Sequence, residues 1–295
     1  QKIEDPRYLY WCDRLGLLVW EEMPSAYAFS SRAVEGVTAE WVEAIARDRS
    51  HPCIVTWVPF NESWGLPDLP RSPQTRAFSQ ALYHLTKALD PTRPVIGNDG
   101  WEQVETDLLT VHDYTDEAEV ILERYGTAAT TLQTLRLLRP GGRRLFLGPL
   151  PLSQPRPVLL TEFGGIAYLP GAEEEGWGYS RVRNEEGFIQ LYSALLEAIH
   201  ACENLAGFCY TQLTDTYQEV NGILTADRKF KADPDLIASA TRGPRSAQEQ
   251  NRDPHPHPFG YSRGWLKKHG VNDQAVQDLL LPFASDEPMS GTNQE

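Results

Sequence analysis

The sequence has no run of about 18 apolar residues, the length that a helix needs to cross a bilayer, so no membrane span is expected. It also lacks an excess of basic residues, because 27 Lys and Arg stand against 41 Asp and Glu and the formal net charge is −14. Nucleic-acid binding depends on a basic surface that releases counterions. Neither a nucleic acid nor a membrane is therefore expected as a partner, and the oligomeric state cannot be read from the sequence.

Cysteine is scarce, with four residues at Cys12, Cys53, Cys202 and Cys209. They lack the spacing of a metal site or a redox pair, so we expect reduced thiols in the core. Residues 1–7 are polar and lack the apolar segment of a secretory signal. Together these features favour a cytoplasmic protein.

Helical and extended periods alternate along the chain, which predicts an α/β fold with a parallel sheet. The predicted helices cover residues 5–16, 38–49, 74–89, 117–138 with an interruption near Gly126, and 185–202. The predicted strands are 17–20, 53–58, 94–97, 107–112, 157–161 and 207–210.

Composition divides the chain into a globular domain at 1–240 and a polar tail at 241–295. Pro and Gly at 140–157 indicate a linker inside the domain. The tail is expected to be largely disordered, with a short helix at 273–281, and His255 and His257 read as part of a polar linker rather than as metal ligands.

Every predicted strand ends in polar or aromatic residues, and in parallel sheets the carboxyl ends of the strands form the active site. One polar strand end is as easily a helix cap, but six in a row indicate a site. The segments are 20–22, 60–62, 98–101, 112–114, 161–165 and 210–212.

Two carboxylates follow apolar strands directly, Glu62 and Glu162. Two buried acids that lie together at the carboxyl ends of the strands push each other's pKa values apart, which leaves one protonated and one ionised. That pair can split a glycosidic bond, since one acid protonates the leaving oxygen and the other attacks the anomeric carbon. Four aromatic residues either offer a flat apolar face to a sugar ring or are ordinary core residues: Trp57, Trp64, Trp101 and Tyr210.

The segment from His51-Pro52 to Asn61-Glu62, followed about one hundred residues later by Thr161-Glu162-Phe163-Gly164, resembles the catalytic barrel of glycoside hydrolase family 2. Residues 5–13 and 219–225 extend the resemblance. The family contains β-galactosidases, β-glucuronidases and β-mannosidases, and its fold is a (β/α)8 TIM barrel. The resemblance implies that strands three to eight are present as an incomplete barrel. We expect the functional protein to extend N-terminally and these 295 residues alone to be inactive or poorly soluble.

The resemblance assigns Glu62 as general acid/base and Glu162 as nucleophile. It implies that Asn61 holds the 2-hydroxyl of the sugar and that Tyr114 hydrogen-bonds the nucleophile, while Tyr210 replaces a larger Trp ring. The expected substrate-binding residues are Asn61, Trp64, Asn98, Asp99, Trp101, His112, Tyr114, Tyr210 and Glu22.

Two departures from the family bear on ligands. Glu22 is followed by Met23-Pro24 and not by the His of metal-binding members, so no metal and no cofactor are expected. Glu219-Val220-Asn221 stands where glucuronidases carry Asn-x-Lys, which favours a neutral sugar. The leading hypothesis is an exo-acting, retaining β-glycoside hydrolase. The alternatives are an inactive carbohydrate-binding remnant and another two-glutamate barrel, such as a cellulase or mannanase.

Overall fold

The structure, a computed structural model, describes residues 2–148, 156–171, 176–216 and 218–244. The chain divides into a large unit, residues 1–13 and 18–244, and a small unit, residues 14–17 and 245–295, of which 14–17 are described and include the end of the first helix. The predicted tail, with His255, His257 and the helix at 273–281, lies outside the described residues beyond position 244. So do residues 149–155 of the predicted linker. No helix in the described ranges is long and apolar enough to cross a lipid bilayer.

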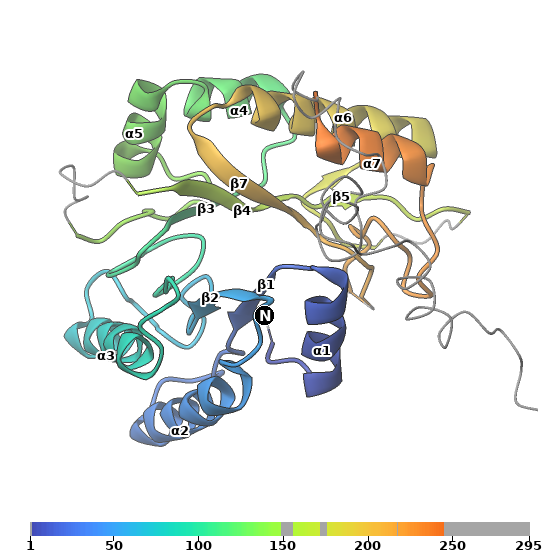
Figure 1. Cartoon of the computed structure of the whole chain (residues 1–295). Helices are drawn as coiled ribbons and strands as arrows, with labels where there is room; N and C mark the ends of the chain where they lie inside the picture. The colour runs from blue at the N-terminus through green and yellow to red at the C-terminus, as the bar shows by residue number, and fades with distance from the viewer. Residues whose placement is uncertain (1, 149–155, 172–175, 217, 245–295) are drawn as a thin grey trace, which may run out of the picture. The chain divides into compact units, whose positions relative to one another are not determined.

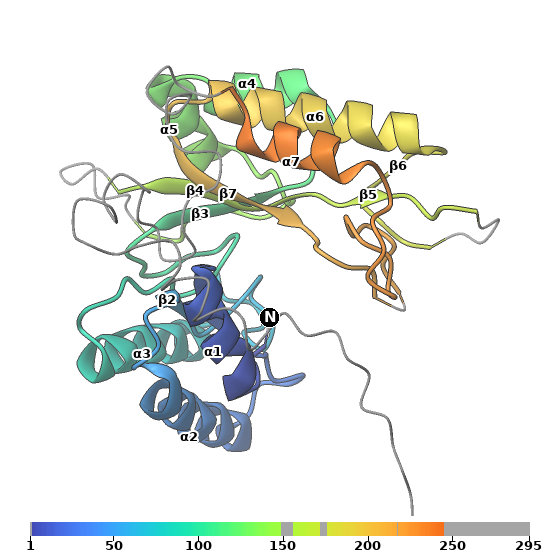
Figure 2. The same cartoon turned by 45° about the vertical axis from the view of Figure 1, so that its right-hand side comes forward.

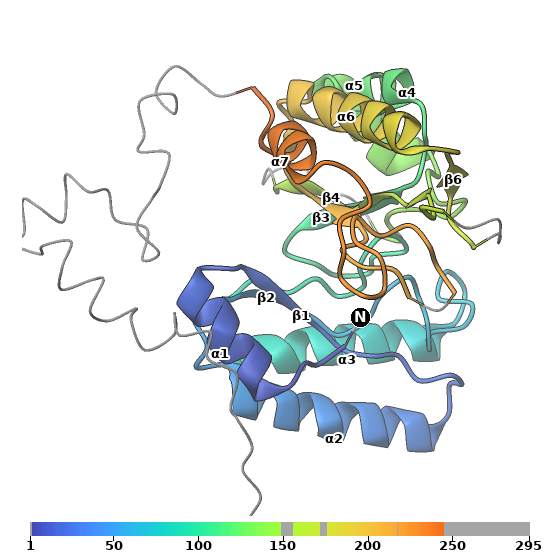
Figure 3. The same cartoon turned by 90° about the vertical axis from the view of Figure 1, so that its right-hand side faces the viewer.

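The first half of the large unit places helices against a pair of parallel strands (Figure 1). Its elements are α1 Pro6–Leu15, β1 Val19–Glu22, α2 Ser31–Asp48, β2 Ile54–Val58 and α3 Pro73–Leu89. Helix α2 starts earlier than predicted, because the Ser30 side chain caps it by accepting a hydrogen bond from the backbone nitrogen of Ala33. Helices α2 and α3 lie side by side (Figure 3).

The second half is a three-stranded parallel sheet, in the order β3-β4-β7, with helices on one face. Figure 2 shows α4, α6 and α7 over this face. The elements are β3 Leu109–Asp113, α4 Ala118–Tyr125, α5 Ala128–Leu137, β4 Val158–Gly164, β5 Ile166–Ala167, β6 Ser180–Arg181, α6 Glu185–Ala201, β7 Leu205–Thr211 and α7 Pro234–Arg242. The predicted interruption near Gly126 divides α4 from α5, and α7 was not predicted.

The described residues show the strand expected at 94–97 only as isolated bridges, from Val95 to Trp57 and from Ile96 to Thr106. A further bridge joins Asp99 to Asn61. Pro94 has no N–H to donate to a ladder, which limits pairing there. The order of the paired segments is that of consecutive barrel strands. Among the described residues β1 pairs only with β2, and the three-stranded sheet ends at β3 and β7, so no closed barrel forms. The prediction of an incomplete parallel barrel is thus confirmed.

Each half has its own apolar core. In the first, Trp41 and Trp57 meet edge to face at 5.7 Å, and Trp57 Nε1 donates to Asp90 Oδ2 at 2.9 Å. Trp57 is fully buried, so it belongs to the core and offers no face to a sugar. In the second core, Phe163 and Leu160 of β4 pack with residues of α6 such as Phe188. All four cysteines are free; three are buried as expected, but Cys209 on β7 is exposed.

Candidate active site

Acidic side chains from neighbouring segments converge at the carboxyl ends of the strands. Glu22 ends β1, Glu62 follows β2, Asp99 follows the bridged segment and Glu162 lies near the end of β4. Glu62 and the next residue, Ser63, adopt left-handed backbone angles, with φ of 52° and 58°. Such angles are unusual for residues with side chains and are typical of functional turns.

His112 of β3 is at the centre of this group. Its Nδ1 atom lies 2.7 Å from Glu62 Oε1, and its Nε2 atom lies 3.6 Å from Asp99 Oδ2 and 3.7 Å from Glu162 Oε1. The ring is fully buried. Ligand atoms of Glu62, His112 and Glu162 all lie within 4.8 Å of one another. The two glutamates that were predicted from the sequence are therefore neighbours in space.

Electrostatics make His112 a cation. Burial alone would lower its pKa, but the negative charges of Glu162 and Asp99 and the hydrogen bond to Glu62 outweigh burial and raise the pKa of His112 well above its usual value. Burial likewise opposes ionisation of Asp99, yet the charge of His112 and the hydrogen bond from the Thr161 hydroxyl lower the Asp99 pKa. The site thus contains a buried imidazolium surrounded by carboxylates.

Glu162 has a second close partner, Tyr114, whose hydroxyl donates to Glu162 Oε2. Burial raises the pKa of Glu162, while the charge of His112 and the Tyr114 hydrogen bond act against that rise. The Tyr114 ring stacks on Tyr179, with centroids 3.4 Å apart. These contacts hold the Glu162 carboxylate in one orientation and favour its ionised form.

Glu22 is different, because burial raises its pKa to about 8, and the negative charges of Asp99 and Glu162 also raise it. At pH 7 this side chain is mostly protonated and can donate a hydrogen bond. Asn61 is also buried, and neither its amide nitrogen nor its amide oxygen has a hydrogen-bond partner among the described residues. An unsatisfied buried amide beside Glu62 suits a sugar hydroxyl, which can both donate and accept.

The other predicted substrate-binding residues differ from one another in exposure and in hydrogen bonding. Trp64 is exposed, and Trp101 meets the His112 ring edge to face at 5.6 Å with an indole N–H that has no partner in the described part of the chain. Asn98 uses its amide inside the protein, since Oδ1 accepts from Ser63 N at 3.0 Å and Nδ2 donates to the Trp101 carbonyl at 2.6 Å. Asn98 therefore shapes the loop and does not point to a ligand.

Tyr210 corrects the expectation of a sugar-stacking ring. It contacts Tyr192 of α6 and Phe163 edge to face at 5.0 and 5.5 Å, and its hydroxyl donates to the Asn221 carbonyl. Successive strand residues point to opposite faces, so Tyr210 faces the helices. Its neighbour on the other face is Cys209, whose side chain is exposed.

Several residues near the site were not predicted from the sequence. Tyr179 stacks on Tyr114, and Trp177 contacts Tyr179 at 4.7 Å. A side chain at Gly165 would collide with the Tyr179 ring, so glycine permits this approach. A second group joins Gln212, Glu219 and Asn221 by hydrogen bonds of 2.7–3.3 Å. The aromatic pair at Trp177 and Tyr179, which follows the predicted strand at 157–161, was the available signal.

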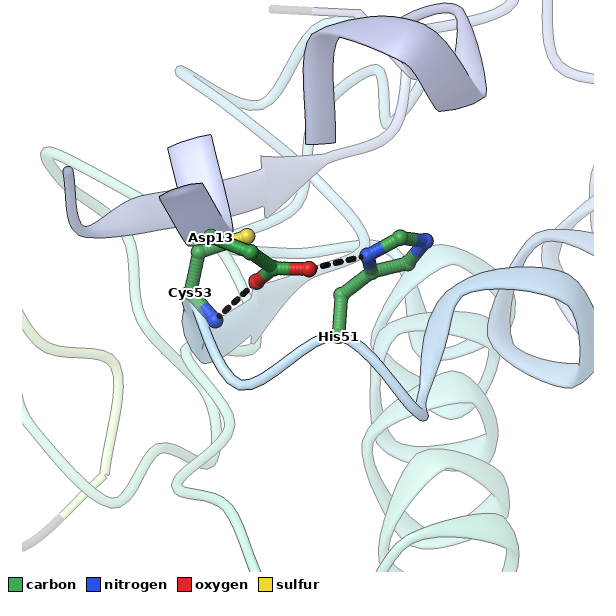
Figure 4. Close-up of side chains that lie close together, drawn as sticks. All are labelled: Asp13, His51 and Cys53. Atoms are coloured by element: carbon green, nitrogen blue, oxygen red, sulfur yellow. Dashed lines mark hydrogen bonds and ion pairs between the residues drawn. The ribbon is translucent and has the colours of Figure 1, made fainter. Parts of the chain in front are cut away.

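Among the residues that the structure describes, two clusters have the composition of metal ligands: the Glu62, His112 and Glu162 group, and Asp13, His51 and Cys53 (Figure 4). In the second, Asp13 Oδ2 lies 2.6 Å from His51 Nδ1, and Asp13 Oδ1 accepts from Cys53 N at 2.8 Å. The Cys53 thiol donates to the Leu9 carbonyl. Because each ligand atom already has a protein partner, we interpret this cluster as a joint between α1 and the start of β2, at the opposite end of that strand from Glu62.

The chain matches the family described as "Glycosyl hydrolases family 2, TIM barrel domain" over residues 4–239. It is 34% identical over 89 residues to a β-glucuronidase of Sus scrofa, a match covering 28% of this chain and 13% of that protein. It is 35% identical over 88 residues to a β-galactosidase of Thermoanaerobacter pseudethanolicus, covering 29% and 11%.

Among solved structures, the fold is similar to a β-galacturonidase from Eisenbergiella tayi bound to galacturonate, with TM-score 0.61, 21% identity, and coverage of 82% of this chain and 44% of that one. It is also similar to a Bifidobacterium dentium β-glucuronidase in complex with coumarin-3-O-glucuronide, with TM-score 0.55, 22% identity, and coverage of 76% and 37%. These likenesses establish the fold. The chain spans less than half the length of these related proteins.

Proposed function

The chain belongs to glycoside hydrolase family 2, and on that premise we propose that it hydrolyses β-glycosides with retention of anomeric configuration, with Glu162 as nucleophile and Glu62 as acid/base. The observation that carries the proposal is the separation of the two glutamates. Their closest oxygens lie within 4.8 Å. Retaining glycosidases place their carboxyl groups about 5–5.5 Å apart, whereas inverting ones need about 6.5–9.5 Å to admit a water molecule.

In the first step Glu62 gives a proton to the leaving oxygen as the bond from that oxygen to the anomeric carbon breaks, and Glu162 forms an ester with that carbon. In the second step Glu62 takes a proton from water, the water oxygen bonds to the anomeric carbon, and the ester breaks. Protonated His112 donates through Nδ1 to Glu62 Oε1. That bond leaves Glu62 Oε2 to carry the transferable proton.

A neutral sugar is the proposed substrate. A uronate carboxylate needs a cationic partner, and the residue in the position of the glucuronidase lysine is Asn221, which bonds to the Glu219 carboxylate. The neighbouring acids Glu22, Asp99 and Glu219 add negative charge or carboxylic acid groups, which suit hydroxyls better than another carboxylate. This proposal differs from the printed substrates of the two structural neighbours, so uronide and neutral glycosides belong in the same assay. We retain exo-action and a cytoplasmic location as expectations.

Covalent trapping tests the proposal, and labelling would also refute the expectation that these 295 residues alone are inactive. Incubation of the full chain with 2-deoxy-2-fluoro β-glycosides, followed by mass spectrometry, should show one sugar mass attached to the peptide that contains Glu162. The Glu162→Gln variant should remain unlabelled, and Glu197→Gln, an acid on helix α6, should label like the parent. Binding of sugars without any labelling would support the alternative of a carbohydrate-binding remnant. Inversion in the first product by NMR would contradict the assigned roles.

A further inference from the structure

A groove of about 840 Å³ beside the site has a charge opposite to that of the protein. Its charged lining consists of Arg71, Arg139, Arg143, Arg144, Asp68 and Glu102. Four guanidinium groups therefore face two carboxylates, on a chain whose formal net charge is −14. Four arginines against two acids give the groove a net positive charge, which attracts an anionic group.

The groove is connected to the catalytic turn by short contacts. Ser63, the residue after Glu62, donates through Oγ to Glu102 Oε2 at 2.6 Å. Glu102 N in turn donates to the Arg144 carbonyl at 2.7 Å, which ties the arginine-bearing loop to the site. The Arg143 guanidinium lies 5.9 Å from the centre of the Trp101 ring, which contacts His112. The groove thus adjoins the acid/base, the residue that faces the leaving group.

Much of the donor capacity in the groove is not used by the protein. Arg139 and Arg144 have no side-chain hydrogen bond or ion pair with any described residue. Arg143 uses Nη1 for Glu102 at 3.3 Å, and Arg71 uses Nε for Asp68 in an exposed pair at 3.0 Å. A guanidinium has five N–H donors in a planar fork that fits carboxylate and sulfate oxygens.

We propose that this groove is a subsite for an anionic group, a carboxylate or sulfate, on the leaving-group side of a β-glycoside. The inference rests on the proposed function, because the leaving-group side is defined by Glu62 as acid/base. It also extends that function: the sugar at the cleaved bond is neutral, and the charge is recognised on its neighbour. Related uronidases are named for an acidic sugar, whereas this chain would recognise an acidic group on the leaving-group side of the cleaved bond.

Calorimetric titration separates this inference from hydrolysis. Three matched neutral-sugar β-glycosides serve as probes, with phenyl, 4-carboxyphenyl and 4-sulfooxyphenyl leaving groups, on the full chain carrying Glu162→Gln to prevent turnover. We expect at least one anionic probe to bind tenfold or more tightly than the phenyl glycoside at low salt, with the preference falling as salt rises. The stronger anionic probe identifies the group. In the same background, Arg139→Gln/Arg144→Gln should remove the preference.

Arg32→Gln/Arg242→Gln is the control, because it removes the same charge from exposed positions on α2 and α7 and should keep the preference. Equal affinity for all three probes, or a preference that survives Arg139→Gln/Arg144→Gln, would overturn the inference. Failure of the anionic probes and of inorganic sulfate to bind would also overturn it. If the preference holds but 2-fluoro glycosides never label Glu162, the catalytic proposal fails and the anion site remains.

Discussion

Replacing His112 with asparagine removes a positive charge that lies among Glu62, Asp99 and Glu162. The Nε2 atom is 3.7 Å from Glu162 Oε1, and at this range an effective dielectric constant of 20 corresponds to about 4 kcal/mol of attraction. Glu162 must be ionised to attack, and its pKa is already raised by burial. Without the imidazolium the pKa of Glu162 rises further. As pH falls, Glu162 is therefore protonated, and stops acting as a nucleophile, at a higher pH than in the parent. One pH unit corresponds to about 1.4 kcal/mol, so about 4 kcal/mol sets an upper limit of about three units. Since solvent screens part of this attraction, the acid limb of kcat/KM should move up by about one to three units.

The assay is the pH profile of kcat/KM for a nitrophenyl β-glycoside, together with ¹⁵N NMR of the histidine rings. NMR reports the charge of His112 whether or not the chain turns over substrate, and the variant identifies the signal. Near pH 8 the ring should still show the imidazolium pattern, and His84→Asn, at an exposed histidine, should leave the profile unchanged. A neutral His112 ring at pH 7, or an unmoved acid limb in His112→Asn, would refute this reasoning.

Three further predictions follow from the same contacts. Tyr114→Phe removes the hydroxyl that donates to Glu162, and we expect kcat to fall about 10- to 100-fold in stopped assays with little change in melting temperature. Glu22→Gln should gain about 1–3 kcal/mol of unfolding free energy over the parent as pH rises from about 5 to 8, measured by urea titration. The reason is that the Glu22 carboxyl ionises at lower pH in the unfolded parent than in the folded parent, where its pKa is about 8. An equal gain at pH 4 would contradict this. Trp57→Ala should lower the free energy of unfolding by about 3–5 kcal/mol, because it leaves a cavity beside Trp41 and removes the hydrogen bond to Asp90. A change under 1 kcal/mol would argue against the core assignment.

Local periodicity was sufficient for most of the fold. Apolar runs located β2 and β4, and the cap and proline at Ser72-Pro73 agree with the start of α3. The segment at 94–97 was the exception. Its apolar residues are buried, as a strand's would be, but pairing depends on neighbours and on backbone donors, which a short segment that starts with proline does not supply.

The order of polar strand ends along the chain determined which residue types reach the site and that two glutamates lead them. Tertiary structure decided which of two adjacent residues points inward. His112 faces the carboxylates while its neighbour Asp113 pairs with Arg124 of α4, and a register shift in the β3-β4 pairing falls just before His112. Tyr210 faces the helices for the same reason. A strand reverses its side chains at every residue, so a shift of one position, invisible in the sequence, exchanges a ligand contact for a core contact.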